Sequence, residues 1–253
     1  KWENNRDLVH RKSYITEGAT CHYTWYVPQN PEGLFEVIRN SKSAKGDDPV
    51  VTRLDDMFDK GWYWHGNEPC HQIPYLYDAA GAPEKTQERV HHILNTEYND
   101  TPGGLSGNDD AGQMSAWYVF SSIGFYPVCP GTPEYYIGTP SFDKVTLNLE
   151  NGKRFVLSAQ RRKADDYLIQ STTLNGNPWS DYRISHQQIL QGGELLPKAS
   201  LNVCTSFGND KVQFEISQVL FAQGGDCHVR TIQRFSCQSI NNLLKLDKRQ
   251  SNL

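Results

Sequence analysis

The spacing of the apolar residues changes near Pro127, and this change limits the possible folds more than any other feature of the sequence. Before Pro127, apolar residues recur at intervals of three or four, as Leu34 and Ile38 do. After it they alternate with polar residues, as Val145 and Leu147 do. An interval of three or four places side chains on one face of a helix, whereas alternation is typical of a strand. The sequence therefore predicts an α+β fold, with helices first and strands second.

Three amphipathic segments of the helical half begin at a proline. We expect these helices to start at Pro31, Pro49 and Pro83, because proline is favoured in the first turn of a helix. A loop over residues 66–77 leads into a shorter helix that Gly81 ends. Helices with one apolar face each, joined by polar loops, favour a helical-pair toroid over a bundle.

Two Asn-Gly pairs mark turns in the alternating half. Asn151-Gly152 follows the run 145–149, and Asn175-Gly176 follows the run 167–174. Asn-Gly between alternating runs is typical of a type I′ turn in a β-hairpin. Ser185 is expected to cap a short helix over residues 186–190. We therefore divide the chain into a helical segment 1–126, an antiparallel β segment 127–208, and a divergent, partly mobile tail 209–253.

The composition excludes several kinds of partner. The 253 residues carry a net charge of −4, and the pI is about 6.1. We expect no nucleic-acid partner, because the basic run 160–163 is short and reads as a solvated turn. We also expect no membrane span, since no apolar run reaches the roughly 18 residues that a spanning helix needs. Lys1 in place of Met suggests a chain that begins within a longer protein, and the sequon at Asn99 is informative only if the protein is secreted.

The stretch 107–120 carries two adjacent acids, Asp109 and Asp110, in a polar turn that enters an apolar helix. Asp110 and Gln113 can be read as a capping box, in which side chains satisfy the free amides at the start of a helix. A chemical reading stays open beside it, because aromatic residues such as Trp117 follow directly. Carboxylates next to aromatic surfaces suit a sugar-binding site.

Two further acidic loops contain Glu17 and the pair Asn67-Glu68. Glycoside hydrolysis needs one carboxyl group that protonates the leaving oxygen and a second that activates water or attacks the sugar. The alternatives from the residues alone are a surface acid for Glu17 and an acidic turn before Pro69 for Glu68. We expect the histidines near these loops to be hydrogen-bonded loop or core residues rather than metal ligands: His22, His65 and His71.

Four ordered blocks of the sequence carry a family resemblance. They are residues 14–28, with Glu17-Gly18, and residues 66–77, 85–87 and 107–131. In these blocks the chain resembles the carboxyl-terminal portion of the calcium-dependent exo-α-mannosidases of glycoside hydrolase family 92. The resemblance implies the later helices of an (α/α)6 toroid followed by a β segment, and a reaction that removes terminal α-mannose with inversion.

The resemblance also implies roles for individual residues. Glu17 would be the general acid, Asp110 the general base and Asp109 its neighbour. A calcium ion would be held near Asn67 and Glu68, where oxygen ligands suit a hard cation. The residues implied in substrate binding are Asn67, Glu68, His71, Asn108 and Trp117.

The chain departs from the family pattern beside the implied acid. Ala19, Cys21 and His22 stand where the family has an amide, an aromatic residue and a second amide. A rival hypothesis from another class is therefore a truncated or degenerate carbohydrate-binding module without turnover. The expected partners are a mannose-containing oligosaccharide or glycoprotein, as in N-glycan processing, and the missing amino-terminal part of the same protein. For the parent protein we expect secreted or periplasmic-type exposure.

Overall fold

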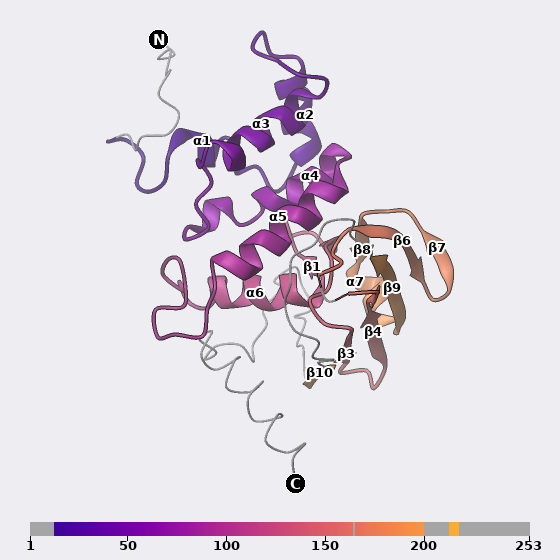
Figure 1. The fold of residues 1–253 in the computed structure, drawn as a ribbon. Helices are drawn as coiled ribbons and strands as arrows, with labels where there is room; N and C mark the ends of the chain where they lie inside the picture. Colours follow the sequence, from indigo (N-terminus) through magenta and orange to yellow (C-terminus); the bar gives the residue numbers. More distant parts are fainter. Residues whose placement is uncertain (1–12, 164, 200–212, 218–253) are drawn as a thin grey trace.

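A computed structural model describes residues 13–163 and 165–199, and the backbone of 213–217. Figure 1 shows the helices on one side of the molecule and most of the strands on the other. This mixed architecture confirms the α+β prediction for the described residues. Their helices are α1 (Thr20–Tyr23), α2 (Pro31–Arg39), α3 (Pro49–Asp59), η1 (Glu68–Cys70), η2 (Ile73–Tyr75), α4 (Leu76–Ala80), α5 (Pro83–Thr96), α6 (Gln113–Ile123) and α7 (His186–Leu190), where η denotes a 3₁₀ helix.

The helices begin and end where local side chains satisfy their backbone groups. The Asn30 side chain accepts a hydrogen bond from the Gly33 amide at the start of α2, and the Asp48 side chain accepts from Val50 at the start of α3. Gly81 follows α4 in the left-handed conformation, with φ +87°, which glycine adopts without steric cost. The predicted starts at the three prolines are thereby confirmed.

The strands form two sheets. The smaller has the order β1-β2-β8, and the larger has the order β10-β3-β4-β9-β6-β7, with β5 beside β9. Their bounds are β1 (Phe125–Tyr126), β2 (Glu134–Ile137), β3 (Lys144–Asn148), β4 (Arg154–Ser158), β5 (Gln160–Arg161), β6 (Ile169–Leu174), β7 (Asn177–Trp179), β8 (Arg183–Ser185), β9 (Gly193–Ala199) and β10 (Gln213–Ser217).

The prediction of an antiparallel β segment is correct only in part. Strand β3 pairs antiparallel with β4, but β9 runs parallel to β4 and β10 runs parallel to β3. The chain reaches β9 after crossing through α7, and a crossover of this kind is what parallel pairing requires. Strand β10 also lies within the segment 209–253 that was predicted to be a divergent tail. The rest of that segment, which was predicted to be partly mobile, lies outside the described residues.

The two Asn-Gly turns differ. Asn175 and Gly176 both have positive φ, +52° and +80°, as a type I′ turn requires. At the other turn only Gly152 is left-handed, and Leu149 and Lys153 close a three-residue loop through the hydrogen bond from the Leu149 amide to the Lys153 carbonyl oxygen. That arrangement corresponds to a type I turn with a left-handed glycine, so the type I′ prediction at residues 151–152 is wrong. The hairpin it joins is nevertheless formed.

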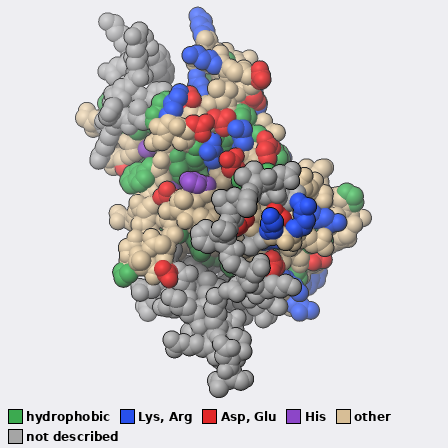
Figure 2. Space-filling view, in the orientation of Figure 1, with side chains coloured by type: hydrophobic (Ala, Val, Ile, Leu, Met, Phe, Trp, Pro, Cys, Tyr) green, Lys and Arg blue, Asp and Glu red, His purple; other side chains and the backbone are tan. Residues whose placement is uncertain are grey.

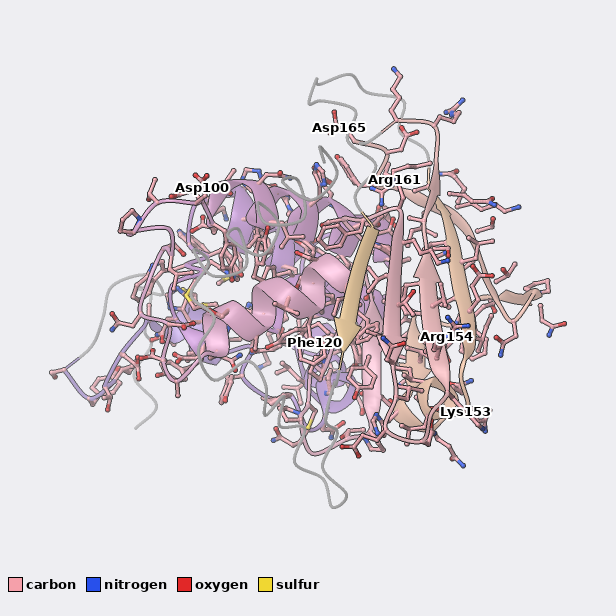
Figure 3. The ribbon with its side chains drawn as sticks, turned by 90° about the horizontal axis from the view of Figure 1, so that it is seen from below. Asp100, Phe120, Lys153, Arg154, Arg161 and Asp165 are labelled. Atoms are coloured by element: carbon pink, nitrogen blue, oxygen red, sulfur yellow. The ribbon has the colours of Figure 1, made fainter. Side chains whose placement is uncertain are left out.

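The helices and the sheets share one hydrophobic core. Helix α6 runs below the other helices in Figure 1, and its carboxyl-terminal end, which carries the labelled Phe120, points toward the strands (Figure 3). The ring of Phe120 lies 5.9 Å from that of Phe125, which lies 5.0 Å from that of Tyr135. The backbone amide of Ile169 in β6 donates to the Gln87 side chain of α5 at 2.8 Å. The predicted boundary at residue 126 therefore marks a change of secondary structure inside one packed unit.

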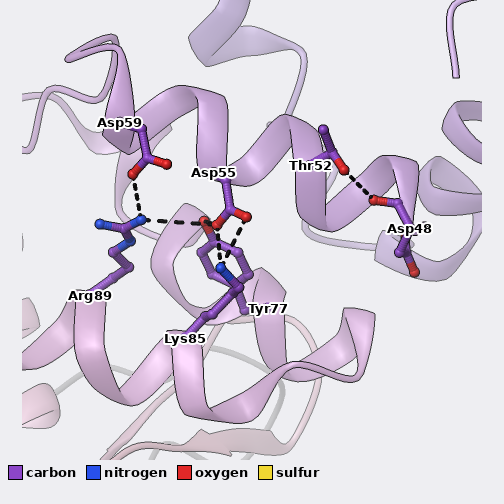
Figure 4. A network of polar contacts seen from close by, with 7 residues as sticks. All are labelled: Asp48, Thr52, Asp55, Asp59, Tyr77, Lys85 and Arg89. Carbon is purple, nitrogen blue, oxygen red and sulfur yellow. Dashed lines mark hydrogen bonds and ion pairs between the residues drawn. The ribbon is translucent and has the colours of Figure 1, made fainter. Parts of the chain in front are cut away.

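A network of charged residues connects α3, α4 and α5 (Figure 4). The carboxylate of Asp55 accepts from the Lys85 ammonium group at 2.9 Å and from the Tyr77 hydroxyl at 3.0 Å. Arg89 donates to Asp59 at 2.7 Å. Acidic and basic side chains are interspersed over the helical part of the face in Figure 2. Among the described residues, the helices are all too short or too polar to cross a membrane.

Candidate active site

Three loops bring the predicted site residues together, and glycines permit their close approach. A Cβ atom at Gly18 would lie 3.4 Å from Nδ2 of Asn67, so the loop that carries Glu17 lies against the loop that carries Asn67. A Cβ atom at Gly107 would overlap the backbone of Gly66. The loops before α1, at η1 and before α6 therefore meet at one place, although they lie far apart in the sequence.

The pKa of Glu68 depends on its burial and on acids in the two other loops. Burial raises the pKa of its carboxyl group first, and a hydrogen-bonding contact with Asp110 and the negative charges of Asp110 and Glu17 raise it further. Each of these effects disfavours the ionised form. The structure thus places Glu17, Glu68 and Asp110 within electrostatic reach of one another, and the pKa of Glu68 lies above its ordinary value.

Asp109 and Asp110 have different roles at the start of α6. Oδ1 of Asp109 accepts a hydrogen bond from the Ser115 amide at 3.0 Å, in the first turn of the helix. The helix has Gly112 as its N-cap residue, so the capping box predicted for Asp110 and Gln113 is wrong. The turn itself is strained, because Asp110 has φ +44° and Ala111 has φ +59°, where side chains other than glycine are unfavourable. Asp109 is the structural acid, and the capping explanation for Asp110 is removed.

His71 lies within electrostatic reach of Asp110 and is held as a neutral ring. Its Nε2 donates to the carbonyl oxygen of His65 at 2.9 Å, so Nδ1 is left to accept from the Gln113 side-chain amide at 3.1 Å. Burial lowers the pKa of His71 to about 4, although its bond to His65 and the charge of Asp110 act in the opposite direction. Both ring nitrogens are occupied by protein, which leaves none for a metal ion or a sugar.

The other two histidines are also satisfied by protein groups. His22 accepts at Nδ1 from the Ala19 amide at 3.1 Å, and its other ring nitrogen pairs with the Trp62 carbonyl oxygen at 2.7 Å. His65 lies between the hydroxyl groups of Tyr63 and Tyr98, at 2.7 and 2.6 Å. These contacts confirm the prediction of hydrogen-bonded histidines.

Trp117 supports the site and does not line it. Its side chain is 0% exposed, and its indole N–H donates to the carbonyl oxygen of His71 at 2.9 Å. The expectation that Trp117 contacts substrate therefore does not fit its position, because its ring is enclosed by core residues. Among the described residues, the exposed large aromatic side chains are Tyr14, Tyr23, Tyr26 and Trp64. Sequence reasoning missed these residues as candidates, and it also missed Gln113 as the partner of His71.

Asn67 and Asn108 complete the set of predicted residues. Asn108 is exposed in the turn before the two acids. Asn67 is 3% exposed, and its Nδ2 atom has no hydrogen-bond partner within the described part of the chain. A buried amide without a partner is costly, and a ligand hydroxyl would satisfy it.

The site offers part of a metal centre. Asn67 and Glu68 offer oxygen atoms of the kind that calcium prefers. Among the described residues, however, no three His, Cys, Asp or Glu side chains are placed to hold a metal ion together. These two residues therefore match calcium in chemistry but do not form a complete site.

Comparison with known proteins gives a consistent set of relatives. Residues 1–198 match the model of the glycosyl hydrolase family 92 catalytic domain. An uncharacterized secreted glycosidase of Arthroderma benhamiae is 35% identical over 182 residues. Two solved structures from Bacteroides thetaiotaomicron, a family GH92 inverting mannosidase and a family GH92 α-mannosidase, are 39% and 37% identical and each have a TM-score of 0.71.

The relatives are much longer than this chain. The alignment with the secreted glycosidase covers 71% of this chain and 23% of the relative. The alignments with the two mannosidases cover 79% of this chain, and 30% and 27% of theirs. The chain therefore spans about a quarter to a third of the length of these relatives.

Proposed function

Since the chain belongs to glycosyl hydrolase family 92, we propose that it contributes the acid-bearing loops of an α-mannosidase that removes terminal α-linked mannose with inversion. The mannosidases with similar structures support the choice of substrate, and one of them is described as inverting. The observation that carries the proposal is the meeting of Glu17, Glu68 and Asp110 from three separate loops. Neighbouring acidic side chains repel one another and so reduce the stability of the fold. A cluster of this kind with a shifted pKa is typical of a catalytic site.

The proposed reaction is a single displacement. Glu17, which is exposed on its loop, gives a proton to the glycosidic oxygen as the bond to the leaving group breaks. Asp110 takes a proton from the water that attacks the anomeric carbon from the opposite face. The product is therefore β-mannose. Asp110 suits the role of base because its carboxylate is exposed and is not used as a helix cap.

Glu68 gives the proposal a second possible acid. Its pKa is raised by burial and by neighbouring negative charge, which favours the protonated form that a proton donor needs. In this alternative Glu68 would protonate the leaving oxygen and Glu17 would bind substrate. The pH profiles of the amide variants distinguish the two assignments. Replacing the general acid by its amide removes the alkaline limb of the rate profile, so Glu17→Gln has this effect in the first assignment and Glu68→Gln in the second.

Calcium is a further part of the proposal. In the assignment with Glu17 as the acid, Asn67 and Glu68 would supply an amide and a carboxylate oxygen to the ion. When bound, the ion would hold sugar hydroxyl groups in place. Differential scanning fluorimetry with calcium, magnesium or a chelator tests this step without an activity assay, and equal melting temperatures in all three would remove calcium from the proposal.

The activity is tested by the release of mannose from α-mannobiosides, followed by NMR at early times. We expect Asp110→Asn to lower kcat by about 100-fold or more, because the base is lost while the side-chain shape is kept. Asp109→Asn is the matched control in the same turn and should lose much less. Retention of configuration in the first product, or a fully active Asp110→Asn variant, would contradict the assignment.

The assay must be made on the 253-residue chain and on any longer product of the same gene. We propose that a longer protein completes an (α/α)6 toroid, that it is secreted, and that it acts on mannose-containing glycoproteins. The name of the Arthroderma benhamiae relative supports secretion. Binding of mannose without turnover by both products would favour the rival function, a carbohydrate-binding module.

A further inference from the structure

One large aromatic side chain is held at the junction of two acid-bearing loops. Trp64 is 47% exposed. A Cβ atom at Gly66 would lie 2.7 Å from Nε1 and 2.9 Å from Cε2 of Trp64, so the indole lies against the backbone next to Asn67. The same Cβ atom would lie 2.6 Å from the carbonyl oxygen of Ser106, in the loop that leads to Asp110. Because Gly66 has no side chain, the Trp64 indole and the loop that leads to Asp110 can both pack against its backbone.

A second exposed ring lies beside the third loop. Tyr23 is 37% exposed, and its Cε2 atom would lie 3.3 Å from a Cβ atom at Gly18, the residue after Glu17. The acids therefore have aromatic surface next to two of their three loops. Trp64 and Tyr23 are therefore candidates for the substrate contact that the sequence analysis had expected of Trp117.

Both the N–H group and the ring face of the Trp64 indole are left unused by the other described side chains. Within the described residues, its N–H group has no hydrogen-bond partner, and no other aromatic ring or cation stacks on it. An indole combines a large apolar face with one polar donor, which suits a ligand with both apolar C–H faces and hydroxyl groups. A hexose ring has this character.

We propose that Trp64 binds the sugar on the leaving side of the scissile bond, an inference that rests on the proposed mannosidase function. An enzyme that removes terminal sugars encloses the terminal unit, whereas the leaving part of the substrate extends toward solvent. A half-exposed indole beside the acids faces that outer part. Trp64 then influences which glycans are accepted and leaves the proton transfers to the acids.

The test compares two substrates that differ in the leaving group. α-Mannobiose has a sugar as its leaving group, and α-mannosyl fluoride has a single atom. Trp64→Ala should lower kcat/KM for α-mannobiose by about tenfold, mainly through KM, with a much smaller loss for the fluoride. Trp64→Phe should recover most of the loss because it restores a stacking face. Val37→Ala, which removes an exposed apolar side chain from α2, is the control and should change neither value.

An equal loss for both substrates would show a general structural role for Trp64, and an unchanged KM for α-mannobiose would exclude the contact. Either result overturns the inference while the mannosidase function stands. If neither the wild-type chain nor a longer product of the same gene turns over either substrate, the function fails, and the inference is tested by NMR titration with α-mannobiose. An indole N–H signal of Trp64 that does not shift at saturating sugar would then overturn it.

Discussion

Asp109 and Asp110 are neighbours in sequence, yet loss of their charges should have different consequences. Asp109 accepts the Ser115 amide, so Asp109→Ala should lower the free energy of unfolding by about 1 kcal/mol. Asp109→Asn keeps an acceptor and should lose less. Urea unfolding followed by circular dichroism measures both, with Asp110→Asn as the variant that should not lower the midpoint, because it removes a charge that repels Glu68. Equal destabilisation by changes at the two positions would contradict the division of roles.

His71 makes the stability depend on pH. Its folded-state pKa of about 4 lies below the ordinary value of 6.5, so the folded state resists protonation while the unfolded state accepts it. The contribution is complete above about pH 6.5 and is lost as the pH falls toward 4, by roughly 3 kcal/mol in all. Burial lowers the pKa of His65 in the same direction.

The free energy of unfolding measured from pH 7 to pH 4 tests this prediction. His71→Gln removes the titrating ring and should flatten part of the curve in that range. The remaining slope should come in part from His65. A curve for His71→Gln that parallels the wild-type curve would show that the ring is protonated, or exposed, in the folded state.

At the scale of the elements, the network in Figure 4 couples α3 to α4 and α5 through one carboxylate. Asp55→Ala leaves the Tyr77 hydroxyl and the Lys85 ammonium group without their acceptor and should lower the free energy of unfolding by about 1–2 kcal/mol. Asp59→Ala breaks only the pair with Arg89, on a more exposed carboxylate, and should cost less than about 1 kcal/mol.

Thermal unfolding of the two variants at low and high salt separates these contributions. The loss in Asp59→Ala should be smaller still at high salt, because exposed pairs are screened. Asp55→Asn keeps an acceptor for Tyr77 and should be intermediate. A larger loss of stability in Asp59→Ala than in Asp55→Ala would contradict the prediction.

At the scale of the whole molecule, the single core predicts that the helical segment does not fold alone. A chain ending at residue 126 keeps Phe120 and Phe125 but lacks Tyr135 and the strands that cover them. It should show no cooperative thermal transition and poor dispersion of its amide NMR signals. A chain ending at residue 199 is the control. Cooperative unfolding of the shorter chain would show that the two segments are independent domains.

Local sequence signals were sufficient to predict several helix starts and one hairpin. A proline in the first turn, a capping side chain and a left-handed glycine act over a few residues, so the starts of α2, α3 and α5 were predicted from the sequence. The β3–β4 hairpin was predicted for the same reason. The parallel pairing of β9 was not, because it depends on a crossover whose destination is set by packing.

The sequence by itself determined where the acidic loops lie and which of their side chains are chemically able to act as acid or base. Only the tertiary structure decided that Asp109 accepts an amide of the first turn of α6, that Trp117 is buried while Trp64 is exposed, and that Gln113 binds His71. The physical reason is that residue type and short-range spacing fix what a side chain can do, whereas burial and hydrogen-bond partners depend on contacts between distant loops. Glu68 shows this most directly, since its raised pKa arises from its burial and from two carboxylates far away in the chain.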